Sequence, residues 1–329
     1  MIRNNIKLAL RTFSKSKTFT LINIIGLTSG LTIALILFLY IHHETTFDET
    51  QSKGKSIYRL VFNADRDGNT EKWGSSPNIA GPAFKENIKE IKNQTRLIRH
   101  NFGDHANVLF GENKYFESNL YWTDSTFNKV FDLELLAGDP VHVLNKPNTI
   151  LLSESTAKKY FGSLNPIGQI LKIDNETDCE VTGVYRDFPQ NGSLDADFLG
   201  SITSMKWMVK NLVWSNASFE TYLLLSDNAT PKDVEKKLAQ TVVREVKAED
   251  RWFSFSLQPF SEMHLNSADI SNTYITRTGD VRQVKIVSAL ALVILLIVCI
   301  NYMNLATARS QKRYKEVGIC KTIGASKWS

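Results

Sequence analysis

The sequence predicts a membrane protein in which two transmembrane α-helices flank one large, mixed α+β domain outside the membrane. Three observations support this fold class. Phe19–Ile41 and Val287–Ala306 are long apolar runs without a charged side chain. Basic residues gather outside these runs, at the two ends of the chain. The long segment between them contains both strand-like and helix-like patterns of apolar residues.

Both apolar runs are long enough to span a membrane, since roughly 20 helical residues cross about 30 Å of hydrocarbon. We expect transmembrane helices over residues 19–41 and 284–306. The first run is longer than the h-region of a signal peptide, about 7 to 15 residues, and no small-residue cleavage site follows it. We therefore expect an uncleaved anchor. Within it, Gly26 and Gly30 have the spacing that lets another helix approach closely, although this spacing also arises by chance.

The charge distribution predicts the orientation. The first 19 residues contain basic residues and no acid, and residues 307–329 carry six basic residues and one acid. The segment between them, residues 20–306, holds 28 basic against 33 acidic side chains. By the positive-inside rule, both termini are cytoplasmic and the domain, expected over residues 42–283, is periplasmic. The overall charge of +5 comes from the tails, so no nucleic-acid partner is expected.

The N-terminal segment, residues 1–18, has apolar residues at helical spacing with basic residues beside them. Ile2, Ile6, Leu10 and Phe13 carry this pattern. It predicts a short amphipathic helix lying in the inner headgroup layer, and a disordered basic tail is the alternative.

The domain is predicted to combine strands and helices around a hydrophobic core, as one large domain or as two packed subdomains. Cys179 is the only cysteine between the spans, so no disulfide can form there. Ser153 and Gly162 bound one helix as its N-cap and its terminating glycine, and Thr230-Pro231 begins another. Strands are predicted over Ile57–Asn63, Thr95–His100, Thr149–Leu152, Glu180–Tyr185, Glu220–Ser226 and Trp252–Gln258, and helices over Ile79–Ile91, Ser153–Phe161 and Pro231–Lys247.

No motif for catalysis, cofactor binding or metal binding is found. The sequence lacks HExxH, paired CxxC, G-x-S-x-G and P-loop patterns. His42, His43, Glu44 and Asp48 stand immediately after the first span, where polar residues are expected at an interface, so a metal site is not predicted there. We expect no cofactor and no enzymatic activity in this chain.

The segment after the second span, residues 307–329, is expected to be a cytoplasmic stalk. We predict that the helix continues beyond Ala306, is interrupted at Gly318, and resumes as a short piece over Ile319–Ile323 that Gly324 ends. A helix, a break and a short helix would suit contact with a soluble partner. By composition alone, a stop-transfer segment that touches acidic lipid is an equal alternative.

The same segment resembles a known family. It closely resembles the second transmembrane helix and the following cytoplasmic segment of FtsX-like permeases of the MacB family, and the domain is similar to that family's periplasmic core. The resemblance covers essentially the whole chain. Its motifs are Asn301–Ser310, Arg313–Ala325, Leu152–Gly162, Asn165–Gly168, Val181–Val184, Asp187–Pro189, Leu8–Arg11 and Phe47-Asp48.

The resemblance implies a non-catalytic permease subunit of an ABC transporter in the bacterial inner membrane. A partner ATPase would hydrolyse ATP, and its movement would pass through the transmembrane helices to the periplasmic domain. Further implied partners are a second permease copy or half, a periplasmic adaptor and membrane lipid. The residues implied to face the ATPase are Arg313, Lys315, Glu316, Val317, Gly318, Ile319, Lys321, Gly324 and Ala325, while Cys320 departs from the basic residue often found there.

Members of the family continue with further transmembrane helices, whereas this chain stops at Ser329. We therefore expect either a fragment of a multi-pass permease or a gene product whose remainder is encoded separately. The family implies export of peptides, lipoproteins or macrolides, or regulation of cell-wall hydrolases without cargo, and no residue chooses among these.

Two other classes of protein share this topology. A bitopic sensor would place a ligand-binding domain between two spans, but its second helix should continue into a heptad-patterned signalling helix, in contrast to the expected break at Gly318. A membrane-anchored surface enzyme would need an acid–base or nucleophile cluster, which the sequence does not contain.

Overall fold

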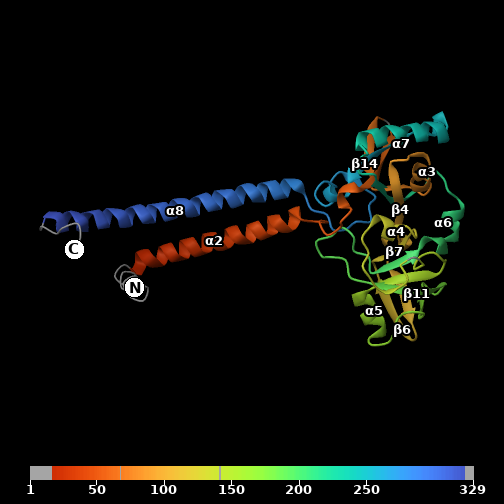
Figure 1. Cartoon of the computed structure of the whole chain (residues 1–329), viewed down its shortest axis with the longest axis horizontal. Helices are drawn as coiled ribbons and strands as arrows, with labels where there is room; N and C mark the ends of the chain where they lie inside the picture. The colour runs from red at the N-terminus through yellow and green to blue at the C-terminus, as the bar shows by residue number, and fades with distance from the viewer. Residues whose placement is uncertain (1–16, 67, 141, 323–329) are drawn as a thin grey trace. The chain divides into compact units, whose positions relative to one another are not determined.

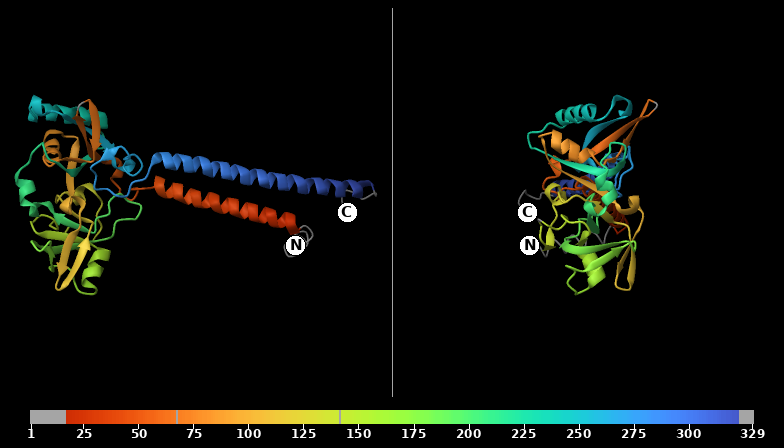
Figure 2. Two further views of the ribbon diagram at one scale, coloured as in Figure 1. Left: turned by 180° about the vertical axis from the view of Figure 1, so that it is seen from behind. Right: turned by 90° about the vertical axis from the view of Figure 1, so that its right-hand side faces the viewer.

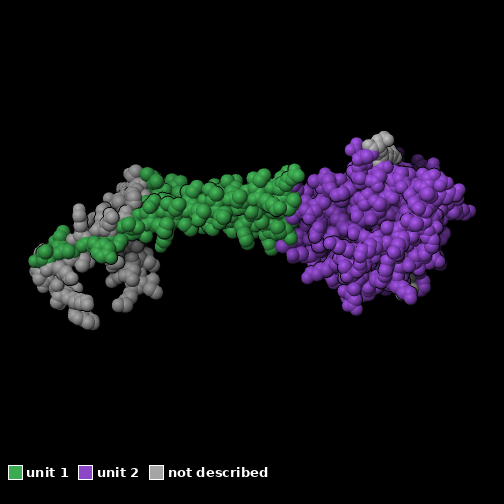
Figure 3. All heavy atoms as spheres, turned by 90° about the horizontal axis from the view of Figure 1, so that it is seen from above, with its two compact units in different colours: residues 1–45, 281–329 green, residues 46–280 purple. Residues whose placement is uncertain are grey.

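The computed structural model describes residues 17–66, 68–140 and 142–322 (Figure 1). The chain divides into two compact units (Figure 3). One unit contains the helices near the two ends of the chain, and the other, which we call the domain, comprises Thr46–Asp280. The two units are described separately below.

The helical unit contains α2 (Lys17–Thr45) and α8 (Val281–Thr322), which contact each other. Leu21–Thr45 and Val281–Asn304 have mean hydropathies of 2.3 and 2.7 and are long enough to cross a membrane. Their large side chains are exposed: Ile22, Phe38 and Leu292 are 64%, 60% and 59% exposed. Apolar surface of this extent is suited to lipid rather than water.

The predicted break at Gly318 is wrong, because α8 continues through Gly318 to Thr322. The hydroxyl of Thr322 donates to the carbonyl of Gly318 at 3.2 Å, as in an ordinary helical turn. A glycine inside a helix costs only about 1 kcal/mol relative to alanine, which is too little to end a helix whose neighbouring residues favour it. The predictions for residues 1–16, and for Gly324 and Ala325, lie outside the described residues.

The domain is built on one mixed sheet of 15 strands. Its main path runs β15-β2-β1-β13-β4-β7-β12-β9-β11-β10-β5-β6, with β14 paired to β1, β3 to β13 and β8 to β11. Most neighbours are antiparallel, while β11 with β9, β12 with β7 and β15 with β2 are parallel. The strands are β1 (Ile57–Arg66), β2 (Asn69–Trp73), β3 (Ser75–Pro77), β4 (Ile91–Arg99), β5 (Ala106–Phe110), β6 (Asn113–Glu117), β7 (Leu120–Thr123), β8 (Leu135–Gly138), β9 (Thr149–Ser153), β10 (Ile170–Ile173), β11 (Thr177–Tyr185), β12 (Phe198–Ser201), β13 (Ala217–Leu225), β14 (Phe253–Pro259) and β15 (Ile270–Ser271).

Helices cover the sheet at its two ends, α3 and α7 at one and α5 at the other (Figures 1 and 2). At the α7 end, Phe62, Phe84 and Leu238 are almost completely buried in one core. At the α5 end, Phe161 and Leu171 lie in another. Each such side chain contributes roughly 1.5 to 3 kcal/mol on burial. The helices are α3 (Ala80–Asn87), α4 (Phe127–Val130), α5 (Glu154–Phe161), α6 (Lys206–Lys210) and α7 (Pro231–Glu245), with 3-10 turns η1 (Gly54–Ser56), η2 (His100–Gly103), η3 (Ile202–Ser204), η4 (Ala248–Asp250) and η5 (Phe260–Glu262).

The mixed α+β class is confirmed, and each of the six predicted strands is present as β1, β4, β9, β11, β13 or β14. The helix predicted over Ile79–Ile91 is shorter, because Ile88 is already extended and Ile91 begins β4. Both isoleucines are buried in the core at the α7 end, so tertiary packing ends the helix there. One continuous sheet runs through the whole domain, which forms a single compact unit.

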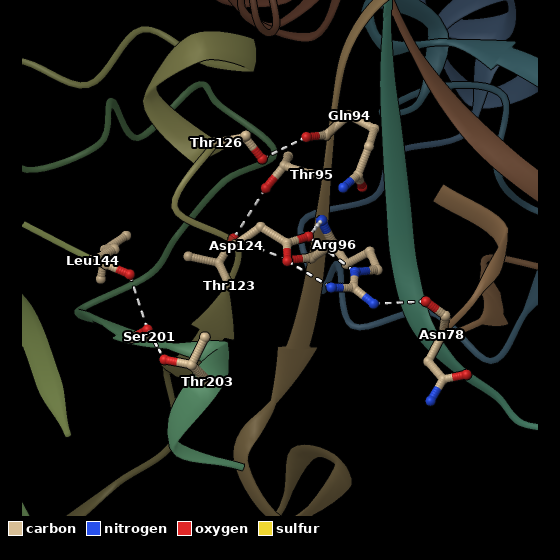
Figure 4. Close-up of polar contacts among 10 residues, drawn as sticks. All are labelled: Asn78, Gln94, Thr95, Arg96, Thr123, Asp124, Thr126, Leu144, Ser201 and Thr203. Atoms are coloured by element: carbon tan, nitrogen blue, oxygen red, sulfur yellow. Dashed lines mark hydrogen bonds and ion pairs between the residues drawn. The ribbon is translucent and has the colours of Figure 1, made fainter. Parts of the chain in front are cut away.

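A buried ion pair joins β4 to β7 at the centre of the sheet (Figure 4). Two nitrogens of the Arg96 guanidinium donate to the two oxygens of Asp124, at 2.9 and 2.6 Å, and a third donates to the Asn78 carbonyl. Beside it, the Thr95 and Thr123 hydroxyls lie 3.2 Å apart. Losing one partner of such a pair costs about 3 to 5 kcal/mol, because the other charge is left buried and uncompensated.

Candidate functional site

The domain is attached to α2 and α8 through two chain segments, which are the candidate functional site. The first connector, Thr46–Ser52, follows α2, and the second connector, His264–Asp280, precedes α8. Both belong to the domain unit. Both also contact one loop between β11 and β12, Asp187–Asp195, which we call the shared loop.

The first connector is fixed to the shared loop by Asp48. This buried residue has a left-handed backbone, with φ of 64°. Its carboxylate accepts hydrogen bonds from the Ser193 backbone N–H and hydroxyl, both at 2.6 Å, and its own N–H donates to the Asn191 carbonyl at 3.0 Å. Hydrogen bonds to a charged acceptor are roughly twice as strong as those between neutral groups. The chain leaving α2 is therefore held at its third residue.

A second contact fixes the far end of the same connector. The Asp132 carboxylate accepts from the Ser52 N–H at 2.5 Å, and the Asp132 N–H donates to the Gln51 side-chain oxygen at 2.8 Å. The first connector is thus held at both ends.

Burial raises the pKa of Asp48, and this effect exceeds the lowering by the Ser193 hydrogen bonds and the nearby His264. The folded domain therefore holds the proton more tightly than the unfolded chain, so stability should fall as the pH rises through this pKa. Asp48→Asn cannot ionise and should lack this loss. We expect the difference in unfolding free energy between wild type and Asp48→Asn to change as the pH rises above about 4, the ordinary pKa of an aspartate, through the raised pKa of Asp48. Chemical denaturation at several pH values measures it, and a constant difference would contradict the prediction.

Two contacts join the second connector to the first connector and to the shared loop. The His264 ring stacks on Phe47 with ring centroids 3.6 Å apart, and its Nδ1 donates to the Arg277 carbonyl at 3.0 Å. The Arg277 guanidinium donates to the Pro189 and Gly192 carbonyls at 3.1 and 3.3 Å. These contacts connect the chain leaving α2 with the chain entering α8.

The second connector is also anchored to the sheet by two buried charges. Arg59 on β1 is fully buried, and its guanidinium donates to the Thr273 and Ser267 hydroxyls, each at 3.0 Å. Glu220 on β13 is 2% exposed and accepts from the Thr273 hydroxyl at 2.5 Å and the Tyr274 N–H at 2.6 Å. Within the described residues neither charge forms a direct ion pair.

Thr273 therefore connects the two buried charges. Its hydroxyl accepts from Arg59 and donates to Glu220, so each charge is stabilised through a residue of the second connector. An unsatisfied buried charge is expensive, which opposes any detachment of this connector. Burial raises the pKa of Tyr222, and the negative charge of Glu220, to which the Tyr222 hydroxyl donates, raises it further. These hydrogen bonds hold the second connector against β1 and β13.

The structure brings the predicted helix-contact residues against α8. A Cβ atom built on Gly30 would overlap the Cγ2 atom of Val298, and one built on Gly26 would lie 3.2 Å from the side-chain nitrogen of Asn301. The predicted ATPase-facing residues 313–321 lie along the last turns of α8, while Gly324 and Ala325 are outside the described residues. No group of three metal-ligating side chains is found among the described residues.

Arg59, Glu220 and Thr273 were not predicted from the sequence. A usable signal was present for the first two, because each is a charged residue inside a largely apolar strand. Such a residue must find a partner when the strand is buried. Thr273 carries no comparable signal, since threonine is common in loops.

Comparison with known proteins agrees with this architecture. Residues 20–241 match the MacB-like periplasmic core domain. Two relatives, both named macrolide export ATP-binding/permease protein MacB, are 24% identical over 223 residues (Aggregatibacter actinomycetemcomitans) and 23% identical over 224 residues (Mannheimia succiniciproducens). The alignments cover 66% and 67% of this chain and 32% of each relative, so the matched region spans about a third of their length.

A solved domain of a Porphyromonas gingivalis protein assigned as a permease has the same fold. It superposes with a TM-score of 0.56 at 22% identity, over 64% of this chain and 92% of that domain. The matched residues 20–241 begin in α2 and include the first connector, Arg59 and Glu220. The family match and the fold together show that this chain belongs to the family of MacB-like periplasmic core domains.

Proposed function

We propose that this chain is part of a non-catalytic permease subunit of a MacB/FtsX-type ABC transporter. Movement driven by ATP hydrolysis in a cytoplasmic ATPase passes through α2 and α8 to the domain, for export or for mechanical signalling. The family match and the two apolar helices support this proposal. The observation that carries it is the attachment of both connectors to one loop and of the second connector to the sheet.

The proposed orientation places both termini in the cytoplasm and the domain in the periplasm of the bacterial inner membrane. Its support is the charge of the chain. The domain, residues 46–280, holds 26 basic against 32 acidic residues, while the remaining residues hold 13 basic against two acidic. The positive-inside rule assigns the basic segments to the cytoplasm. The proposed partners are the ATPase, a second permease copy or half, a periplasmic adaptor and lipid.

The continuous helix α8, which extends to Thr322 without a break at Gly318, is also compatible with a bitopic sensor. Helix continuity therefore does not separate a sensor from a permease. The family match does, since residues 20–241 match the core domain of MacB-like proteins. The named relatives combine an ATP-binding part with a permease part.

The contact with the ATPase is testable at the end of α8. The test uses membranes that contain the full permease and its ATPase. Reversing the charges of Glu316 and Lys321 (Glu316→Lys with Lys321→Glu) should weaken the association of permease and ATPase at least tenfold, which corresponds to about 1.4 kcal/mol. Co-purification measures association, and ATPase activity measures coupling.

The matched control reverses another pair of opposite charges, Asp233 and Lys236 on α7 of the domain. Their ion pair spans 3.1 Å and is largely exposed. This control should leave association and ATPase activity unchanged. Normal association and activity in the Glu316/Lys321 variant would reject the proposed contact.

A further inference from the structure

A cavity of about 300 Å³ lies in the domain, away from the connectors and lined by none of their residues. It is formed by η2 after β4, the turn between β10 and β11, and the segment between η3 and α6. Its volume is at the lower end of the range for small-molecule sites. The lining residues that matter here are His100, Phe102, Trp122, Asp174, Glu176 and Met205.

The polar wall of the cavity is fixed by a chain of hydrogen bonds. The Trp122 indole N–H donates to Nδ1 of His100 at 2.9 Å, so the other ring nitrogen carries the proton and donates to Asp174 at 2.7 Å. Asp174 also accepts from the Asn101 side chain and the Asn107 N–H, at 3.0 and 2.8 Å. Burial opposes ionisation of Asp174, but these hydrogen bonds outweigh it and lower its pKa to about 2. The wall is therefore rigid, and the carboxylate of Asp174 is already occupied.

The Phe102 ring forms the aromatic wall of the cavity, and its backbone is held in an unfavourable conformation. Asn101 and Phe102 are consecutive non-glycine residues in the left-handed region, with φ of 49° and 55°. A residue in this region costs of order 1 to 2 kcal/mol in backbone free energy. Asparagine adopts the region more readily than phenylalanine does, so Phe102 is the more unusual of the two. The Phe102 side chain is 60% exposed, so burial of the ring does not compensate. Strain of this kind, beside a cavity, points to a functional reason for presenting the ring.

The electrostatics of the cavity favour a cation. Glu176 is exposed and forms no ion pair within the described part of the chain. Two carboxylates line the cavity, Asp174 and Glu176, against the one guanidinium of Arg99, so the charges of the lining sum to −1. The domain as a whole has an excess of six acidic residues, 32 against 26. A positively charged ligand would therefore be attracted at long range and paired at Glu176.

We propose that this cavity binds a small organic cation that has an ammonium group and an apolar body. The ammonium group pairs with the Glu176 carboxylate, and the apolar body packs against the Phe102 ring and the Met205 side chain. Packing the apolar body against an aromatic ring and a methionine side chain removes apolar surface from water, which stabilises the complex. The site is independent of the proposed coupling to an ATPase, because it requires neither α8 nor a partner.

Calorimetric titration of the full chain in zwitterionic nanodiscs tests the site, with phenyltrimethylammonium as the probe and benzyl alcohol as its neutral counterpart. We expect the cation to bind at least tenfold more tightly than the alcohol, and Glu176→Gln to remove this difference. Since every variant is in the same nanodiscs, partition of the probe into lipid cancels between them. Equal binding of both probes to wild type, or unchanged cation binding by Glu176→Gln, would overturn the proposal.

Two glycine variants distinguish the effect of losing the Phe102 ring from the effect of relieving backbone strain. Phe102→Gly removes both the ring and the strain, so the domain should unfold at the same or a higher temperature while cation binding falls severalfold. Asn272→Gly relieves left-handed backbone strain away from the cavity, at φ of 48°, and keeps the ring, so it should retain cation binding within about twofold. Cation binding that survives in Phe102→Gly would exclude the aromatic wall from the site.

Discussion

Thr273→Val should lower the unfolding free energy of the domain by roughly 2 to 4 kcal/mol, the largest loss expected from any substitution in the connectors. Valine has nearly the shape of threonine, so the change removes the hydroxyl without opening a cavity. Arg59 then loses the acceptor at 3.0 Å, and Glu220 loses the donor at 2.5 Å. Both charges stay buried and incompletely satisfied. Chemical denaturation followed by tryptophan fluorescence measures the loss.

Thr273→Ser is the matched control. It keeps the hydroxyl and removes one methyl group, which should cost no more than about 1 kcal/mol. A further test places Thr273→Val in a background where Arg59 is Met and Glu220 is Gln. In this background the Thr273 hydroxyl no longer contacts two buried charges, so Thr273→Val should lower the unfolding free energy by less than it does in wild type. Equal losses for Val and Ser, or the same loss in both backgrounds, would contradict the bridging role of Thr273.

The elements that sequence patterns predict well are those determined by neighbouring residues. The spans follow from uninterrupted apolar runs, and the strands from short apolar segments such as Thr149–Leu152. Helix α5 is a further case, because the Ser153 hydroxyl accepts from the Thr156 N–H and Gly162 has φ of 59°, as the predicted cap and terminator require. Each of these features is decided by one continuous stretch of chain.

The candidate site could not be assembled in the same way, because its partners are distant in sequence. Arg59 and Thr273 are 214 residues apart, and Thr273 and Glu220 are 53 apart. Phe47-Asp48 and Asp187–Pro189 could be noticed as motifs, but their sequence does not show that they meet at the shared loop. Only the folded sheet brings β1, β13 and the second connector together.

The predicted break at Gly318 shows a different limit. Glycine ends helices mainly when it adopts a left-handed conformation, and a glycine in the helix interior is only mildly unfavourable. Gly162, with φ of 59°, ends α5, whereas Gly318 lies within α8. The same residue type gives opposite results, and the surrounding turns decide which one occurs.

Gly30→Leu should disrupt the close packing of α2 against α8. The structure leaves no room for a Cβ atom at Gly30, because that atom would overlap Val298. Overpacking of this kind costs about 1 to 3 kcal/mol, which the pair can relieve by moving the helices apart. In lipid, helix association depends mainly on close packing, so this loss should be decisive. A disulfide between Gly26→Cys and Asn301→Cys reports the distance, since a Cβ atom at Gly26 lies 3.2 Å from the Asn301 side chain.

We expect Gly30→Leu to reduce the yield of this disulfide at least fivefold in membranes, and Val298→Gly in the same chain to restore much of it. Thr32→Leu adds the same side chain at an exposed position of α2 and should leave the yield unchanged. A disulfide within one chain keeps the monomer's mobility on a gel, which separates it from a bond between two copies. If Gly30→Leu leaves the yield within one chain unchanged, the glycines do not determine the contact. A movement of α8 could then reach the domain without α2, through the second connector alone.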